Sequence, residues 1–217
     1  MRNTKRRNIS MLYSKYIYKF GMYTIVGLGN PGEEYVTTRH NVAWLVLEQF
    51  VGAQAFSSFS NSSLYSANLS EGRIENTPVT VLLPSTFMNN SGVAVAKFVR
   101  DRGTLDTLVV VHDDVDIPFG EVRVAYDRGA GGHNGIKSII DSCGSTAFIR
   151  VRVGIARKGI FGGVKRPTGE ALSHFVLGRF TTSELKALKE VGERVHTALT
   201  LIVTKGKEEA MQVVNKG

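Results

Sequence analysis

The stretch Gly27-Leu28-Gly29-Asn30-Pro31-Gly32-Glu33-Glu34-Tyr35-Val36-Thr37-Thr38-Arg39-His40-Asn41 joins two apolar segments of this 217-residue chain. The segment before it, Tyr23–Val26, predicts a strand, and the segment after it predicts a helix over about 41–51. A glycine-rich turn at the carboxyl end of a strand is where open α/β sheets present their backbone to ligands. His40 lies just beyond this turn and can exchange a proton near neutral pH. The stretch therefore predicts an α/β fold with a site at its first turn.

Gly27, Gly29 and Gly32 also satisfy G-x-G-x-x-G, the fingerprint of dinucleotide-binding proteins. That fingerprint requires a helix that opens at the glycines and an acidic residue about 20 positions further on. The residues from Gly32 to Asn41 form no apolar-periodic helix, and Glu48 lies inside a helix pattern instead of at a strand end. A dinucleotide-dependent oxidoreductase is therefore a weak alternative. A purely structural turn with a capping Asn is a second one.

The composition is that of an ordinary globular protein, with 42% hydrophobic and 21% charged residues. The chain is long enough for one well-buried core, and no apolar run reaches the ~18 residues that a membrane span needs. Cys143 is the only cysteine, which excludes an internal disulfide and a thiolate metal cage.

The net charge of +8 is distributed unevenly along the chain. Residues 1–21 hold six cations and no acid, whereas the rest of the chain holds 21 cations and 19 acids. The body is nearly neutral, so its charge alone does not indicate a nucleic-acid partner. The basic start loosely suits a transit peptide for an organelle, but Met22 directly before the first strand favours an upstream start codon. We expect a disordered extension over 1–21 and a single cytoplasmic domain over 22–217.

Strand and helix patterns alternate along the rest of the chain. Ser91 is expected to cap a helix, Glu71-Gly72 is expected to separate two strands, and Ser57–Ser63 is expected to form a loop. This alternation predicts a single three-layer α/β domain with a twisted, mostly parallel (mixed) sheet flanked by helices. Strands are expected at about 64–69, 79–83, 108–111, 121–125 and 148–155, helices at about 93–99, 136–142, 183–203 and 207–214, and a mobile basic loop at 158–169.

Four polar clusters follow predicted strands or open predicted helices: Asn30 to His40, Asn89, Asp113, and His133-Asn134. In a doubly wound sheet such loops converge on one edge. There a histidine can take a proton from water, and a carboxylate can hold its other ring nitrogen. Amides can anchor a peptide-like substrate and stabilise an oxyanion. If His40, Asp113 and Asn89 lay on separate surfaces, this interpretation would be wrong.

Two other chemistries compete with activation of water by a histidine. A serine or cysteine nucleophile is not indicated, because no G-x-S-x-G is present and Cys143 has no local activator. His112, Asp113, Asp114 and Asp116 could instead bind a divalent metal. No complementary cluster of ligands is evident elsewhere, so we expect no metal and no cofactor.

A second glycine-rich turn, Gly129–Gly135, opens the helix predicted at 136–142. Backbone N–H groups at a helix start attract phosphate, and Lys137 lies in that first turn. Arg128, Arg150 and Arg152 lie close to this turn in the sequence or on the following strand, and they could line an anionic groove. The alternative is an ordinary solvated strand face beside a basic loop.

The motifs together resemble the bacterial-type peptidyl-tRNA hydrolase family. The resemblance covers about residues 22–205, and the blocks at 27–41 and 129–139 are highly specific. The matching blocks are G-L-G-N-P-G-x-x-Y-x-x-T-R-H-N (27–41), P-S-T-F-M-N-N-S-G (84–92), H-D-D-V-D-I-P-F-G (112–120), G-A-G-G-H-N-G-I-K-S-I (129–139), F-I-R-V-R-V-G-I-A-R (148–157) and F-V-L-G-R-F (175–180).

This resemblance implies hydrolysis of the ester that joins a peptide to the 3′ end of tRNA, by a monomer without cofactors. It implies that His40 is the general base, that Asp113 stabilises its proton-accepting form, and that Asn30 distinguishes blocked from free aminoacyl ends. Substrate contacts are implied for Tyr35, Phe87, Asn89 and Asn134, support of the site for His133, and possible contacts to the tRNA backbone for Lys137, Arg128, Arg150 and Arg152.

Two sites in the chain depart from the family pattern. Ala43 replaces a common glycine, which a helical backbone tolerates, and Asp127-Arg128 replaces a frequent lysine-glycine pair, which bears on tRNA affinity. The main alternative to the hydrolase is a catalytically idle RNA-binding relative of the splicing-factor kind. Retention of Asn30, His40, Asn89 and Asp113 argues against it.

Overall fold

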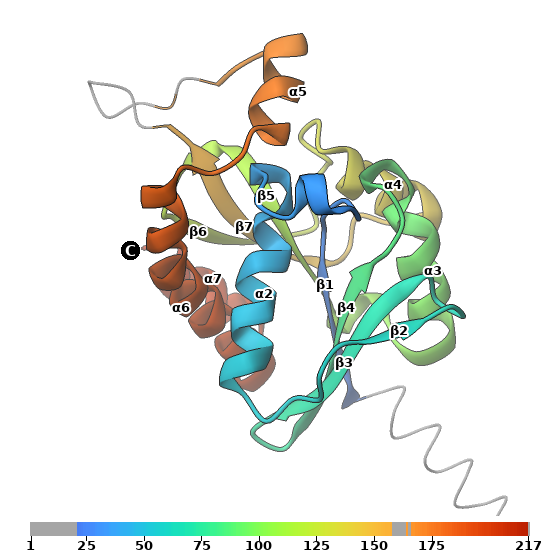
Figure 1. Cartoon of the computed structure of the whole chain (residues 1–217). Coiled ribbons are helices and arrows are strands. Elements are labelled where there is room, and N and C mark those ends of the chain that lie inside the picture. The colour runs from blue at the N-terminus through green and yellow to red at the C-terminus, as the bar shows by residue number, and fades with distance from the viewer. Residues whose placement is uncertain (1–20, 158–163, 165, 217) are drawn as a thin grey trace, which may run out of the picture.

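Two of the predicted apolar strands, β1 (Tyr23–Gly27) and β5 (Leu108–Pro118), lie side by side in the middle of one sheet (Figure 1). The computed structural model describes residues 21–157, 164 and 166–216. In this part of the chain the sheet has seven strands in the order β2-β3-β4-β1-β5-β7-β6. The remaining strands are β2 (Ser60–Ser62), β3 (Ala67–Ile74), β4 (Thr77–Pro84), β6 (Val122–Tyr126) and β7 (Ile149–Ala156).

The sheet is parallel at its centre and antiparallel at its edges. Strands β4, β1, β5 and β7 run parallel to one another, whereas β2, β3 and β6 pair antiparallel with their neighbours. Helical crossovers join the parallel strands, and a tight turn at Glu75 (φ 50°) joins β3 to β4. The predicted fold class, a mixed sheet flanked by helices, is confirmed.

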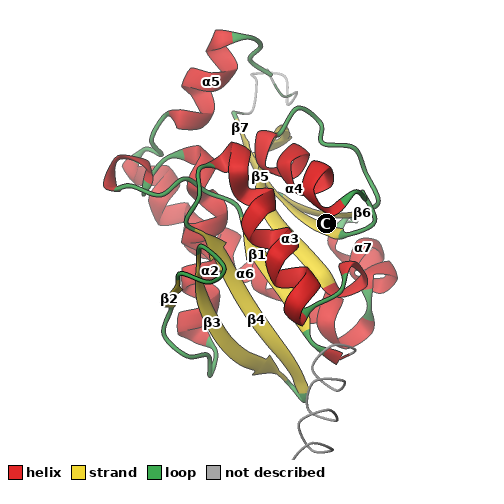
Figure 2. Ribbon diagram, turned by 90° about the vertical axis from the view of Figure 1, so that its right-hand side faces the viewer, coloured by secondary structure: helices red, strands yellow, loops and turns green. Residues whose placement is uncertain are grey.

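Helices cover both faces of this sheet and make three layers (Figure 2). Helices α2 (Val42–Ala53) and α6 (Thr182–Lys205) pack on one face, and α3 (Ser91–Arg102) and α4 (Asn134–Cys143) pack on the other. Helix α7 (Lys207–Val214) follows α6, and α5 (Glu170–Leu177) stands beyond the edge of the sheet (Figure 1). The connections at that edge carry the candidate site.

The central strands are buried on both faces, which explains their unbroken apolar runs. In β1, Ile25 packs into the core under α2 and α6, and Val26 packs into the core under α3 and α4. Strand β5 alternates in the same way, with Val109 on the first side and Val110 on the second. Edge strand β6 is closed by Asn215, whose side-chain amide makes two hydrogen bonds with the backbone of Val124 (2.8 and 2.9 Å).

Two predictions about the strands on the β2–β4 side are wrong. Glu71 and Gly72 lie inside β3 and not between strands, because Gly72 leaves room for the ring of Phe56 and Glu71 pairs with Arg102. The polar stretch predicted as a loop over 57–63 contains the short edge strand β2. A strand at the edge needs only one pairing partner, so polarity does not exclude it.

Three further features differ from the prediction: the end of β5, the cap of α3 and the presence of α5. Strand β5 continues past its apolar run to Pro118, so His112 and Asp113 are strand residues instead of loop residues. Helix α3 is capped at Asn90 without a side-chain hydrogen bond, so the predicted cap at Ser91 is wrong. Helix α5 was not predicted at all.

Some predictions lie outside the described residues: the basic extension, except Gly21, and most of the loop over 158–169. Among the described helices, none combines the length and the apolar character that crossing a membrane requires.

Candidate active site

His40 lies at the end of the glycine-rich connection, on the short 3-10 helix η2 (Arg39–Asn41) that leads into α2. The residue is 9% exposed, because β5 and the loop before α4 pack against it. Its Nδ1 donates a hydrogen bond of 2.8 Å to Oδ1 of Asp113. The other ring nitrogen, Nε2, has no hydrogen-bond partner among the described residues. This nitrogen is therefore available to a substrate water.

Asp113 accepts hydrogen bonds from two imidazoles at a single carboxylate oxygen. Besides His40, its Oδ1 accepts from Nε2 of His133 at 2.9 Å. The carboxylate lies on β5 and is almost fully buried. Two donors from separate elements thus hold one oxygen in place.

The loop before α4 determines which nitrogen of His133 carries the hydrogen. Nδ1 of His133 caps α4 by accepting from the backbone N–H groups of Gly135 (3.1 Å) and Ile136 (3.3 Å). Because Nδ1 must keep its lone pair for these amides, the hydrogen lies on Nε2 and points to Asp113. The amides of Gly135 and Ile136 are therefore engaged by this side chain and are not free to receive a phosphate.

The electrostatics suit His40 as a base. Burial disfavours the charged imidazole, but the charge of Asp113 and its hydrogen bond outweigh burial, so the pKa of His40 is raised above its ordinary value. Burial also favours the neutral acid at Asp113, yet its imidazole partners hold the pKa of Asp113 well below its usual range. Asp113 is thus ionised whenever His40 is neutral. His112 is not a second base, because burial and the neighbouring His133 lower the pKa of His112 to about 3.

The donor set does not favour a metal centre. The acidic residues beside Asp113 are engaged by arginines: Asp114 pairs with Arg152 at 2.7 Å, and Asp116 pairs with Arg166 at 2.9 Å. The ligand atoms of His40, Asp113 and His133 lie within 4.8 Å of one another. However, Nε2 of His133 carries a hydrogen and offers no lone pair to a cation. The three side chains instead form one hydrogen-bonded group, with both imidazoles on the carboxylate of Asp113.

Neighbouring residues engage the backbone of Asn30 and its side-chain oxygen, so that only the side-chain NH₂ group is left free. Asn41 clamps the backbone of Asn30 from both sides, with hydrogen bonds of 2.9 Å from Asn30 N to Asn41 Oδ1 and from Asn41 Nδ2 to Asn30 O. The side-chain oxygen of Asn30 accepts from the backbone N–H of Met88 at 2.8 Å. Asn30 Nδ2 has no partner in the described part of the chain, so it can donate to a substrate carbonyl.

Tyr35, Phe87 and Asn89 lie on the Asn30 side of the site. The rings of Tyr35 and Phe87 meet edge to face with centroids 6.4 Å apart, and Phe87 is 55% exposed. Asn89 is exposed on η3 (Met88–Asn90), next to the residue whose amide binds Asn30. Asn89 makes no hydrogen bond to His40 or Asp113 within the described part of the chain.

A cavity of about 860 Å³ opens on the other side of His40. His40, Asp113, His133 and Asn134 line it near β5 and α4, and several arginines line the part beneath the second glycine-rich turn. The side chains predicted from sequence therefore form two groups that meet at η2.

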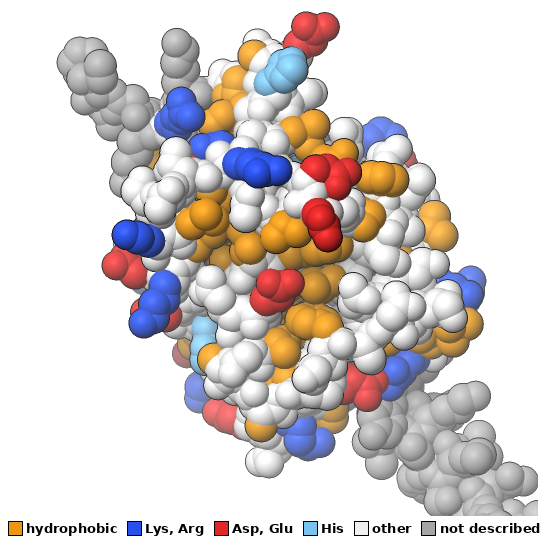
Figure 3. Space-filling model, viewed as in Figure 1, with side chains coloured by type: hydrophobic (Ala, Val, Ile, Leu, Met, Phe, Trp, Pro, Cys, Tyr) orange, Lys and Arg blue, Asp and Glu red, His pale blue; other side chains and the backbone are white. Residues whose placement is uncertain are grey.

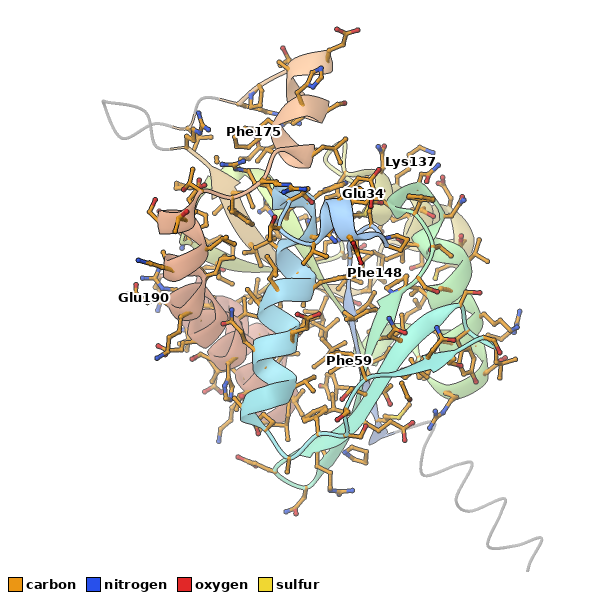
Figure 4. All side chains as sticks on the ribbon, in the orientation of Figure 1. Glu34, Phe59, Lys137, Phe148, Phe175 and Glu190 are labelled. Carbon is orange, nitrogen blue, oxygen red and sulfur yellow. The ribbon has the colours of Figure 1, made fainter. Side chains whose placement is uncertain are left out.

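The four cations predicted as tRNA contacts differ in their surroundings. Arg150 is only 2% exposed: it donates to the backbone oxygen of Arg128 and stacks over the ring of the interior Phe148 (Figure 4), and burial lowers the pKa of Arg150 to about 10. Because it is buried, Arg150 braces the loop and is not a surface cation. Arg152 is half-buried and paired with Asp114, while Arg128 and Lys137 are exposed, with Lys137 bound to Asp141.

On the face drawn in Figure 3, positive and negative side chains are scattered around a hydrophobic middle.

Several residues around the site were not assigned a role from sequence. Asn41 lies beside His40, but nothing in a single sequence indicates that its side-chain amide hydrogen-bonds to the backbone of Asn30. Glu184 and Arg39, which pair across the molecule, are 145 positions apart. Ala43, one of the two departures from the family pattern, lies within helix α2, as its substitution for glycine requires.

Known proteins are similar to this chain in sequence and in fold. The family model for peptidyl-tRNA hydrolase matches residues 24–217. The peptidyl-tRNA hydrolase of Syntrophotalea carbinolica is 39% identical over 196 residues, which cover 89% of this chain and 97% of that protein. The peptidyl-tRNA hydrolase of Thermodesulfovibrio yellowstonii is 35% identical over 90% of this chain and 100% of its own. The crystal structure of peptidyl-tRNA hydrolase from Acinetobacter baumannii has a TM-score of 0.77 and 31% identity, covering 89% of this chain and 94% of that chain. The chain therefore belongs to the peptidyl-tRNA hydrolase family.

Proposed function

We propose that this chain hydrolyses the ester bond between tRNA and a peptide, or an N-blocked amino acid, with a water that His40 activates. The tRNA that is released is then free for reuse in translation. The observation that carries this proposal is the hydrogen bond of 2.8 Å between His40 Nδ1 and Asp113, which leaves Nε2 as the basic nitrogen. The family assignment supplies the substrate class.

The reaction needs one base and a set of hydrogen-bond donors. His40 Nε2 takes a proton from water as the water oxygen bonds to the ester carbonyl carbon, and Asp113 stabilises the imidazolium that forms. The resulting oxyanion is stabilised by nearby amide donors, of which Asn30 Nδ2 is the best placed. When the intermediate collapses, the bond to the ribose 3′ oxygen breaks and the proton passes from His40 to that oxygen. A ribose alkoxide is a far better leaving group than an amide nitrogen, so no covalent intermediate is required.

The two groups of side chains divide the substrate between them. Asn30 lies between the base and the exposed rings of Tyr35 and Phe87, so the peptide side of the ester belongs to this group, together with Asn89. The tRNA acceptor end belongs to the cavity beside Asn134, where Arg128 and Arg152 can meet phosphates. Such contacts read shape and backbone instead of sequence. His133 supports Asp113, and Lys137 remains an exposed candidate at the rim.

We further assign the whole reaction to one copy of the chain. The side chains assigned to the chemistry (Asn30, His40 and Asp113) and to the tRNA (Arg128 and Arg152) all lie within residues 22–217, which supports a catalytic domain over this range that acts as a monomer, with 1–21 as an extension outside it. Because translation supplies the substrate, we place the protein in the cytoplasm.

Hydrolysis of a blocked aminoacyl-tRNA tests the function directly. The purified protein is expected to release free tRNA from N-acetyl-aminoacyl-tRNA at least about tenfold faster than from the same aminoacyl-tRNA with a free amine, because Asn30 faces the peptide side of the ester. Acid-gel separation of charged and free tRNA measures both rates. If neither substrate is cleaved while tRNA still binds, the protein is an RNA-binding relative and not a hydrolase.

Substitution of Asn41 by alanine tests whether its amide orients Asn30. The change removes both hydrogen bonds to the Asn30 backbone, worth roughly 1 kcal/mol each, so we expect kcat/KM to fall about 10-fold to 30-fold. The preference for blocked over free aminoacyl ends is expected to narrow as well. Steady-state kinetics on both substrates measure these effects, and Asn61→Ala, an exposed asparagine bonded to Asn68, is the matched control. If the preference for blocked over free aminoacyl ends stayed unchanged, the hydrogen bonds from Asn41 would not be what orients Asn30.

A further inference from the structure

Arg39, the residue before the proposed base, is one of the most enclosed charged groups of the described chain, with 4% of its side chain exposed. Its Nη2 donates to both carboxylate oxygens of Glu184, at 2.9 and 3.1 Å, and its Nη1 donates to the backbone oxygen of Arg179 at 2.8 Å. Its guanidinium carbon lies 5.0 Å and 5.3 Å from the ring centroids of Phe175 and Phe180. These partners all come from one short stretch of chain, which runs from the last turn of α5 to the first turn of α6.

Backbone hydrogen bonds join the same two segments. Arg39 N donates to Gly178 O at 3.0 Å, and Phe180 N donates to Thr37 O at 2.9 Å. Between these bonds, Thr38 and Arg179 form an isolated antiparallel bridge. The turn that carries His40 is therefore held by a segment that follows it by about 140 residues.

Glu184 has a second task that makes its position rigid. It forms the capping box of α6, in which Glu184 Oε2 accepts from Thr181 N at 2.7 Å while Thr181 Oγ1 accepts from Glu184 N. Although partial burial opposes the charge, hydrogen bonds from Thr181 and Arg39 lower the pKa of Glu184. The carboxylate thus stays ionised and fixed to the start of a 24-residue helix.

We propose that Arg39, held by Glu184, is a positioning residue for the hydrolytic reaction: it locks η2 so that His40 stays on Asp113 and Asn41 stays on Asn30. This inference rests on the proposed function. Arg39, His40 and Asn41 are consecutive residues of a single 3-10 turn, so the turn cannot rotate without moving all three side chains. Displacement by about 1 Å breaks a hydrogen bond of 2.8 Å and misaligns the base.

The same contacts connect the active site to α5. Leu172, Ser173 and Val176 of this helix line the cavity, and Phe175 projects toward η2 below it (Figure 4). Arg39 is the side chain on which Phe175 rests, so the docking of α5 over the cavity and the orientation of His40 depend on one guanidinium. An interior lysine could keep the charge but not the bidentate geometry.

Two variants and one matched control test this role. Arg39→Lys keeps the charge and loses the fork, and Glu184→Gln loses the charge while its side-chain oxygen can still cap α6. The control is Arg102→Lys, because Arg102 is likewise ion-paired (to Glu71, 2.8 Å) and likewise stacks on a ring (Phe98, 5.5 Å), but it lies far from the site on α3. Each variant is assayed on N-acetyl-aminoacyl-tRNA and by NMR titration of the His40 imidazole.

We expect kcat to fall about 10-fold to 100-fold in Arg39→Lys and Glu184→Gln, with KM changed less than threefold. The double variant should be no worse than the poorer single one, since both remove the same link. The NMR titration of His40 should move to lower pH. Among the described residues, the imidazole is faced by Asp113 from β5 and by His133 before α4, and separation from Asp113 removes the carboxylate that raises its pKa. Arg102→Lys should match the wild type in every readout.

The opposing outcome is equally specific. If both variants melt at lower temperature but keep the wild-type kcat, pH profile and His40 titration, then the link only stabilises the fold and the inference is wrong. If the wild type itself cleaves no ester, the proposed function fails, but the His40 titration still reports whether Arg39 positions the imidazole. Should Arg39→Lys fail to fold, Glu184→Gln with its retained cap decides the matter.

Discussion

Replacement of His40 by alanine is expected to reduce ester hydrolysis by about 10²- to 10⁴-fold while tRNA binding stays nearly intact. His40 is the group with a free basic nitrogen beside an ionised carboxylate, and the described site offers no substitute for it. His112 is buried with its pKa lowered to about 3. The unprotonated ring nitrogen of His133, Nδ1, accepts hydrogen bonds from the start of α4. The residual rate should come from Asn30 and substrate positioning alone. Single-turnover hydrolysis of N-acetyl-aminoacyl-tRNA and a filter-binding titration of tRNA measure the two properties separately.

The control for this prediction is His196→Gln, which changes a histidine on α6 that hydrogen-bonds to Gln54 outside the site. It should hydrolyse the ester at the wild-type rate. Residual activity above about one tenth in His40→Ala would remove His40 from the role of base. A parallel loss of tRNA affinity would instead assign His40 to binding.

The sequence predicts the meeting of His40 and Asp113 for a simple topological reason. Apolar runs identify β1 and β5 as buried strands, and polar residues at the carboxyl ends of neighbouring parallel strands share one edge of the sheet. The structure places β1 and β5 in direct parallel pairing, with Val26 opposite Val110. That pairing brings the connection after β1 to the end of β5. The prediction needed only a mostly parallel sheet, which the alternation of strands and helices indicates, while the order of the strands is known from the structure.

Long-range side-chain partners could not be predicted in this way. Thr181-x-x-Glu184 is a recognisable capping box. The capping box alone accounts for Glu184 at this position, so nothing in the sequence reveals that Glu184 also binds Arg39. Arg150 and Arg152 both alternate with apolar neighbours on β7, and this pattern predicts one exposed charged face. The loop after β6 then covers Arg150 and leaves Arg152 half-exposed. Whether a loop folds over a strand is a property of the tertiary structure, which alternation does not contain.

The departure at Asp127-Arg128 illustrates the same limit. Asp127 has a positive φ of 51°, a conformation that an aspartate tolerates better than most residues, and it accepts a hydrogen bond of 2.5 Å from Thr146. The sequence shows only that a lysine-glycine pair has been replaced. The structure shows that Asp127 adopts this turn conformation and that the backbone oxygen of Arg128 accepts a hydrogen bond from Arg150.

Asp113→Asn is expected to lower kcat/KM by about 10²- to 10³-fold without changing the geometry of the site. Both imidazoles donate to the same oxygen, Oδ1, so an asparagine that turned its NH₂ group toward them would lose two hydrogen bonds at once. The amide oxygen should therefore stay in place and keep His40 in its productive tautomer. What disappears is the negative charge that stabilises the imidazolium, and the loss should be smaller than in sites where an asparagine turns the histidine into the wrong tautomer.

The pH dependence distinguishes this electrostatic role from a structural one. In the wild type, burial alone would lower the pKa of His40, and Asp113 raises it above the ordinary value, so activity should disappear as the pH falls through that raised pKa. In Asp113→Asn, burial remains and the attraction is gone, so the pKa of His40 should fall. The variant should therefore keep its reduced activity to more acidic pH than the wild type keeps its own. Profiles of kcat/KM measure the shift, and Asp101→Asn, an exposed carboxylate paired with Arg100, should leave the profile unchanged. An acid limb that stays in place would mean that Asp113 orients His40 without tuning its basicity. A limb that moves to higher pH would mean that Asp113 does not raise the pKa of His40.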